Sequence, residues 1–105
     1  MGADFFHNSY ECDDYQKGYD ELVRMAEIIV PGPYSGTIKE TDGVWLFEQR
    51  EFSAKTLEDA FDEAEKWQCG DAARDMVEKW GPAMCVYCKG KDGRSGYFYW
   101  GLASR

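Results

Sequence analysis

The segment TLEDAFDEAEKWQ, Thr56 to Gln68, decides the fold because it divides into an apolar half and an acidic half. At 100° per residue, the two halves occupy opposite sides of a helix. The spacing predicts an amphipathic helix entered through Ser53 or Thr56 and closed by Cys69-Gly70. The apolar side holds Leu57, Ala60, Phe61, Ala64 and Trp67, and the acidic side holds Glu58, Asp59, Asp62, Glu63 and Glu65.

Upstream of this helix, the sequence predicts a first helix over residues 9–29 that ends at Pro31-Gly32-Pro33. Asn8 and Glu11 have capping-box spacing at its start. Gly18 weakens a helix by about 1 kcal/mol relative to alanine, so the first two turns are expected to fray or begin late. Its apolar positions recur at helical intervals at Tyr15, Tyr19, Leu22, Ala26 and Ile29.

Two hairpins are predicted around the central helix. Tyr34–Thr41 and Val44–Phe52 flank Asp42-Gly43, a dipeptide that favours a type I′ turn. AMCVYC and GYFYWGLAS frame the connection KGKDGRSG near the end of the chain. Between the hairpins, Asp71 is expected to cap a short helix whose shared face carries Ala73, Met76, Val77 and Trp80.

The resulting order, α-β-β-α-α-β-β, predicts an α+β fold. We expect a four-stranded antiparallel sheet built from the two hairpins, with the helices packed on one face. A chain of 105 residues with 44% hydrophobic and 16% aromatic residues is expected to form a single compact acidic domain, residues 1–105. Pairing between the two hairpins is left open.

The chain carries a net charge of −8 that is unevenly distributed. Residues 1–78 hold 19 acidic and 7 basic side chains, whereas residues 79–105 hold 1 and 5. An acidic body disfavours direct nucleic-acid binding and favours a basic partner, although net charge also serves solubility alone. With no run of about 18 apolar residues and no signal-like start, we expect a cytoplasmic protein, in the host cytoplasm if it is phage-encoded.

The acidic face of the central helix has two interpretations. Like-charge pairs three and four residues apart cost of the order of 1–2 kcal/mol in total, which indicates a surface kept for a partner. The alternative is an ordinary solvated helix face. Further acids on the first helix would join a continuous patch if the two helices lie side by side: Glu11, Asp13, Asp14, Asp20, Glu21 and Glu27.

The cysteines allow a metal site but do not specify one. Cys85 and Cys88 in MCVYCKGKDG have the look of a zinc knuckle, and Cys12, Cys69 or His7 would have to complete it. The competing interpretation puts Cys85 and Cys88 on opposite faces of a strand as small hydrophobic residues. A redox role lacks the usual strand-to-helix setting. We therefore expect no cofactor and treat the cysteines only as candidates.

Catalysis has little support in the sequence. His7 is the only histidine, and no nucleophile motif or nucleotide-binding loop is present. Pairs such as Cys85 with His7, or Glu48 with Glu51, occur by chance in most domains. We therefore expect a protein that is not an enzyme.

The last hairpin combines basic and aromatic side chains that are suited to stacking bases: Lys89, Lys91, Arg94, Tyr97, Phe98, Tyr99 and Trp100. If Phe98 and Trp100 point inward, Tyr97 and Tyr99 lie on an outer face that a partner covers. The alternative is that neighbours such as Tyr87 shield this second pair.

The leading hypothesis is a small noncatalytic inhibitor, phage- or mobile-element-encoded and of the anti-CRISPR or anti-restriction type. It would occupy a basic nucleic-acid-binding site on a larger protein, and a homodimer is allowed. The contact residues would be Glu58, Asp59, Asp62, Glu63, Glu65, Tyr97 and Tyr99. The alternative is a zinc-binding or nucleic-acid-binding adaptor built on the CVYC segment and the basic hairpin.

Overall fold

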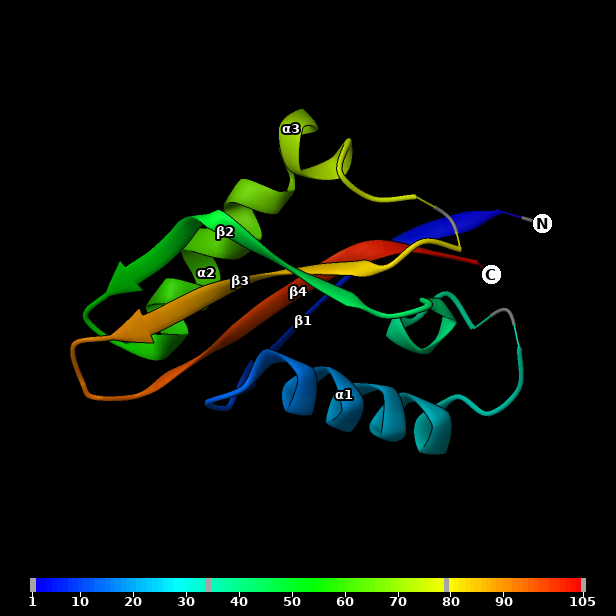
Figure 1. Cartoon of the computed structure of the whole chain (residues 1–105), viewed down its shortest axis with the longest axis horizontal. Coiled ribbons are helices and arrows are strands. Elements are labelled where there is room, and N and C mark those ends of the chain that lie inside the picture. The colour runs from blue at the N-terminus through cyan, green and yellow to red at the C-terminus, as the bar shows by residue number, and fades with distance from the viewer. Residues whose placement is uncertain (1, 34, 79, 105) are drawn as a thin grey trace.

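The computed structural model describes residues 2–33, 35–78 and 80–104 (Figure 1). Strands and helices alternate along the first two thirds of the chain, and a hairpin closes it. The elements are β1 (Ala3–Glu11), α1 (Tyr15–Ile29), a 3-10 turn (Ile38–Glu40), β2 (Val44–Ala54), α2 (Leu57–Gln68), α3 (Asp71–Arg74), β3 (Ala83–Gly90) and β4 (Ser95–Ser104).

The four strands form one mixed sheet in the order β1-β4-β3-β2. β4 is antiparallel to both β1 and β3, whereas β2 is parallel to β3. The α+β class, a sheet of four strands and the last hairpin are confirmed, but β1 takes the place of the strand predicted at Tyr34–Thr41. The prediction of a purely antiparallel sheet is wrong. α2 and α3 lie between β2 and β3 in the chain, and this crossover connection brings β3 back in the same direction as β2.

The N-terminal residues form a strand, so the predicted helix over residues 9–29 is wrong in its first part. Period-2 alternation buries Phe6 while Phe5 and His7 stay exposed. The helix begins only at Tyr15, where Asp14 Oδ1 accepts hydrogen bonds from the N–H groups of residues 16 and 17 at 2.8 and 3.4 Å. The capping box expected at Asn8 and Glu11 therefore does not form.

The first predicted hairpin is also wrong. Ile38–Glu40 forms a 3-10 turn where Tyr34–Thr41 was expected to be a strand, and Tyr34 itself lies outside the described residues. The Ser35 N–H and hydroxyl both donate to Glu40 Oε2, at 3.1 and 2.8 Å. Such local side-chain bonds offer the backbone an alternative to a strand ladder. The second half of the hairpin prediction, Val44–Phe52, corresponds to β2.

Helices cover both faces of the sheet rather than one. Figure 1 shows α1 on one side of the sheet and α3 on the other. α1 packs on a core cluster that contains Phe6, Cys85 and Tyr99, and α2 packs on a second cluster that contains Val86 and Trp100. The prediction that helices cover only one face is wrong. β3 and β4 carry apolar side chains on both faces of the sheet, and helices must shield each face from water.

The central helix forms as predicted, with Thr56 as its N-cap accepting the Asp59 N–H at 3.1 Å. The following helix is shorter than expected, and its N-cap is Gly70 rather than Asp71. Trp80, expected on its apolar face, is 52% exposed and has a positive φ of 71°. This left-handed conformation is incompatible with a continuing right-handed helix.

Candidate protein-binding surface

The outer side of α2 carries the acidic face that the sequence predicts. Leu57, Ala60 and Ala64 are fully buried against the sheet, and this packing fixes the rotation of the helix. The acidic side chains therefore project away from the core. Glu58, Asp59, Asp62 and Glu63 are exposed, and Glu65 is intermediate.

Two of these five acids contact basic side chains of other elements. Arg94, next to the tip of the last hairpin, bridges Glu58 and Glu11, with N–O distances of 2.7 and 2.8 Å. On the same side of α2, Glu65 Oε1 lies 3.2 Å from His7 Nε2 in β1. The acidic helix is thus tied to the edge strand β1 near both of its ends.

The other three acids, Asp59, Asp62 and Glu63, form no ion pair with any residue that the structure describes. They stand within two turns of one helix on its exposed side. Mutual repulsion between such charges is relieved when a cation approaches. We call Asp59, Asp62 and Glu63 the open acidic triplet.

The expected continuous patch across the first two helices does not form. α1 and α2 pack on opposite faces of the sheet, so the acids of α1 belong to a different side of the molecule. Glu11 is the exception, because it sits at the end of β1 and reaches α2 through Arg94.

The aromatic residues proposed as an anchor lie elsewhere than expected. Tyr99 is fully buried under α1, and its hydroxyl donates to the Tyr15 carbonyl at 2.7 Å. Burial raises its pKa. Tyr97 is partly buried, with ring centroids 5.5 Å from Tyr87 and 5.9 Å from Tyr15. The idea of an uncovered Tyr97–Tyr99 face is wrong, and the shielding by Tyr87 is confirmed for Tyr97.

The cysteines are distributed rather than gathered. Cys85 and Cys88 lie on opposite faces of β3, each buried in a different core cluster, and burial raises both thiol pKa values to about 12. Cys69 is exposed at the end of α2, and Cys12 is half-buried beside Tyr99. Residues 85 and 88 therefore cannot form one half of a zinc site, and residues 2–33, 35–78 and 80–104 hold no group of three metal-binding side chains.

The basic hairpin is largely occupied by the protein's own acids. Lys89 Nζ lies 3.9 Å from Glu51, and Arg94 holds Glu11 and Glu58. Only Lys91 of the three cations forms no ion pair within the described part of the chain. This arrangement weakens the case for a nucleic-acid surface at the tip.

An exposed tryptophan on the edge strand β2 was missed by the sequence reasoning. Trp45 is 66% exposed and borders a hollow of about 250 Å³ that is also lined by Met76, Pro82 and Met84. Tryptophan and methionine are typical of binding surfaces. Its exposure was hidden in the sequence because VWLF is apolar at every position, so no alternation marks the outward side chain.

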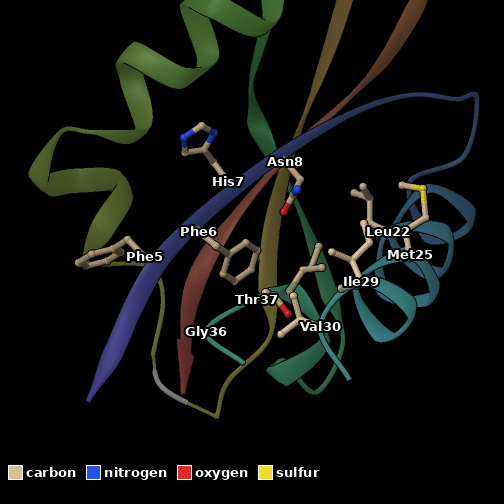
Figure 2. Close-up of a pocket in the computed structure, with 12 residues that line it drawn as sticks. Phe5, Phe6, His7, Asn8, Leu22, Met25, Ile29, Val30, Gly36 and Thr37 are labelled. Carbon is tan, nitrogen blue, oxygen red and sulfur yellow. The ribbon is translucent and has the colours of Figure 1, made fainter. Parts of the chain in front are cut away.

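A larger groove of about 440 Å³ lies between β1 and the C-terminal half of α1 (Figure 2). Its walls are mostly apolar and include Phe6, Leu22, Met25 and Ile29, whereas Asn8 and Thr37 add polar groups. Figure 2 shows Phe6 and Asn8 on the groove side of β1, and Phe5 and His7 on the other side. This groove was not predicted from the sequence, because residues 9–11 of β1 were assigned to a helix.

No protein-family model, curated protein or solved structure matches the chain. Among the described residues, no helix has the length and apolar character needed to cross a membrane.

Proposed function

We propose that the protein is a small noncatalytic inhibitor that binds a larger protein through the exposed face of α2. The partner carries a basic surface, most concretely the nucleic-acid-binding site of an anti-CRISPR or anti-restriction target, and the acidic helix occupies it. The open acidic triplet supports this proposal, because three carboxylates on two turns form no ion pair with any described residue. Complementary charge of this kind speeds association and selects the partner.

Trp45 supplies the exposed aromatic group that such an interface needs, in place of Tyr97 and Tyr99. It lies on the α2 side of β2, two residues from Phe47, whose ring stacks 5.8 Å from Trp67 near the end of α2. The hollow beside Trp45, lined by Met76, Glu78, Pro82 and Met84, lies on the same face of the sheet as α2. A charged rim next to a tryptophan is the usual anatomy of a protein interface.

The test is affinity capture from host lysate at low and high salt, followed by calorimetry with the purified partner. Replacing Asp59, Asp62 and Glu63 with serine should weaken binding at least tenfold at low salt, and less at high salt, because screening already reduces the attraction. Nucleic acid should compete with the wild-type protein for the same partner.

The matched control replaces Asp13, Asp20 and Glu27, three exposed acids outside the α2 surface, with serine. It changes the net charge by the same amount on the α1 side of the molecule. Equal weakening by both triple variants would show that only net charge matters. Unchanged affinity in the α2 variant would overturn the proposal.

A further inference from the structure

β1 is an edge strand whose free side is bordered by two very different surfaces. It pairs with β4 over nine residues, and within residues 2–33, 35–78 and 80–104 no strand lies on its other side. Alternate backbone N–H and C=O groups of an edge strand point outward and are available to another strand. A strand that pairs with β1 would therefore have one face on the α1 side of the sheet and the other face on the α2 side.

The α1 side of this edge is apolar. The groove of about 440 Å³ runs beside β1, with Phe6 and Leu22 at its base and Met25 and Ile29 on its α1 wall. At the groove, the side chain of Ile29 remains 76% exposed. Contiguous exposed apolar side chains of this kind mark a binding site.

The α2 side of the same edge is acidic. Glu65 contacts His7 in the middle of β1, and Glu58 is joined to Glu11 at its end through Arg94. Asp62 lies between Glu58 and Glu65 along the helix, at the i+4 and i−3 positions, on the same stripe. A row of carboxylates therefore follows β1 on this side.

We propose that β1 accepts an extended segment of the partner as a fifth strand of the sheet. Because side chains alternate across a strand, such a segment would carry aliphatic residues toward the groove and Lys or Arg toward α2. The inference rests on the proposed function and specifies it: the basic partner presents a strand of alternating basic and aliphatic residues.

A second copy of the chain fits this edge less well than a basic segment does. Figure 2 shows Phe5 and His7 on the α2 side of β1, and period-2 alternation adds Ala3, Ser9 and Glu11, so this side of the strand carries no lysine or arginine. Pairing two copies through β1 would also bring together two acidic helices of a chain that carries −8. Like charges at close range oppose that assembly.

The test uses the full chain and a synthetic peptide, RIKVRIKVR, with NMR titration and amide hydrogen exchange. Binding should slow exchange at β1 amides whose N–H groups face the open edge. A peptide of the same composition with its basic residues in one block should bind at least tenfold more weakly. Two further alternating peptides carry N-methyl groups on every second amide, one peptide in each of the two possible frames. In one frame the N-methyl groups replace the N–H groups that would donate to β1 carbonyls, so strand pairing predicts that this peptide binds more weakly than the other. Charge attraction alone would leave the two peptides equal.

The variants Ile29→Glu and Ile28→Glu form a matched pair. Both change an exposed isoleucine to the same acid one residue apart, but only Ile29 lines the groove. The first should weaken binding of RIKVRIKVR at least tenfold, and the second should leave it within about twofold. Circular dichroism confirms that both remain folded.

The outcomes separate this inference from the proposed function. Suppose that the block peptide, the alternating peptide and the N-methylated peptides bind equally, and that only the α2 triple variant weakens their binding. Strand addition is then wrong, whereas the acidic surface of the proposed function is supported. If peptide binding depends on Ile29 and not on the α2 acids, the basic half of the inference is wrong. A stable dimer with protected β1 amides in the absence of peptide would overturn it in favour of a second copy.

Discussion

Gly18 in α1 lies directly against the hydroxyl of Tyr99 in β4. A methyl group at residue 18 would overlap that hydroxyl and lie 2.7 Å from the Cys12 sulfur. The helix can approach β4 this closely only without a side chain here, and the Tyr99 hydroxyl uses the approach to donate to the Tyr15 carbonyl at 2.7 Å.

Gly18→Ala should therefore destabilise the protein, although alanine favours a helix by about 1 kcal/mol. Overpacking at a buried contact costs about 1–3 kcal/mol and should exceed that gain. Urea unfolding measures the change. Lys17→Ala, one residue earlier on the exposed side of the helix, is the control and should change the free energy of unfolding by less than about 0.5 kcal/mol.

The same contact predicts coupling between the two positions. Tyr99→Phe removes the hydroxyl that the new methyl group would meet, so Gly18→Ala should cost less in that background than in the wild type. A double-mutant cycle should give a coupling energy of about 0.5–2 kcal/mol. Strict additivity would show that the Cys12 contact, and not Tyr99, requires the glycine.

Trp100 holds α3 against the sheet. Its ring is fully buried, and its indole N–H donates to the Ala73 carbonyl at 2.9 Å. Trp100→Phe removes this indole hydrogen bond and opens a cavity, so the free energy of unfolding should fall by about 2–4 kcal/mol in urea melts. Trp45→Phe, on the exposed edge, should change it by less than about 0.5 kcal/mol, and equal effects would contradict this assignment.

The buried thiols predict a loss of stability at alkaline pH. Burial raises the pKa values of Cys85 and Cys88 from 9.0 to about 12. Between these values the unfolded chain releases thiol protons that the folded chain keeps, so stability is fully present below pH 9 and declines as pH rises to 12. Each thiol contributes a slope of up to about 1.4 kcal/mol per pH unit.

Urea unfolding at a series of pH values from 8 to 10.5 measures this slope. Cys88→Ala should make it shallower, and Cys69→Ser should not, because Cys69 is exposed. Tyr19 and Tyr99, whose pKa values burial also raises, add a decline of the same sign above pH 10. A stability that is flat across this range would contradict the burial of both thiols.

Arg94 moderates the acidic surface, which predicts a variant that binds more strongly. Arg94→Gln releases Glu58 and Glu11 from their shared cation and adds two uncompensated carboxylates beside the open acidic triplet. Affinity for the basic partner should rise at low salt and return toward the wild-type value at high salt. Lys17→Gln makes the same charge change on α1 and should have a smaller effect. Weaker binding by Arg94→Gln would mean that the bridge positions α2 instead.

Local signals account for the parts of the fold that the sequence predicted. α2 has a strong helical period and Thr56 as a cap, and the last hairpin has two apolar runs around a glycine-rich connection. The acidic face follows directly from the same period. In contrast, ADFFHNSYE combines a short alternating pattern with capping spacing, and only pairing with β4 favours the strand.

The candidate site could be predicted only in part, because local sequence signals do not report contacts between distant residues. The positions of Asp59, Asp62 and Glu63 depend on α2 alone. Two other acids of α2 are contacted by side chains from distant parts of the chain. Arg94, just before β4, contacts Glu58, and His7 in β1 contacts Glu65. The burial of Tyr99 and the groove beside β1 both depend on where α1 packs.

The α+β class, the central amphipathic helix, its outward negative charge and the final hairpin follow from local sequence signals, because short-range periodicity and caps act within a dozen residues. Tertiary structure alone decided that β2 runs parallel to β3, that helices cover both faces, and that β1 forms an open edge between an apolar groove and an acidic helix. These features arise from contacts between distant residues such as Gly18 and Tyr99, where the free energy of packing overrides local preference.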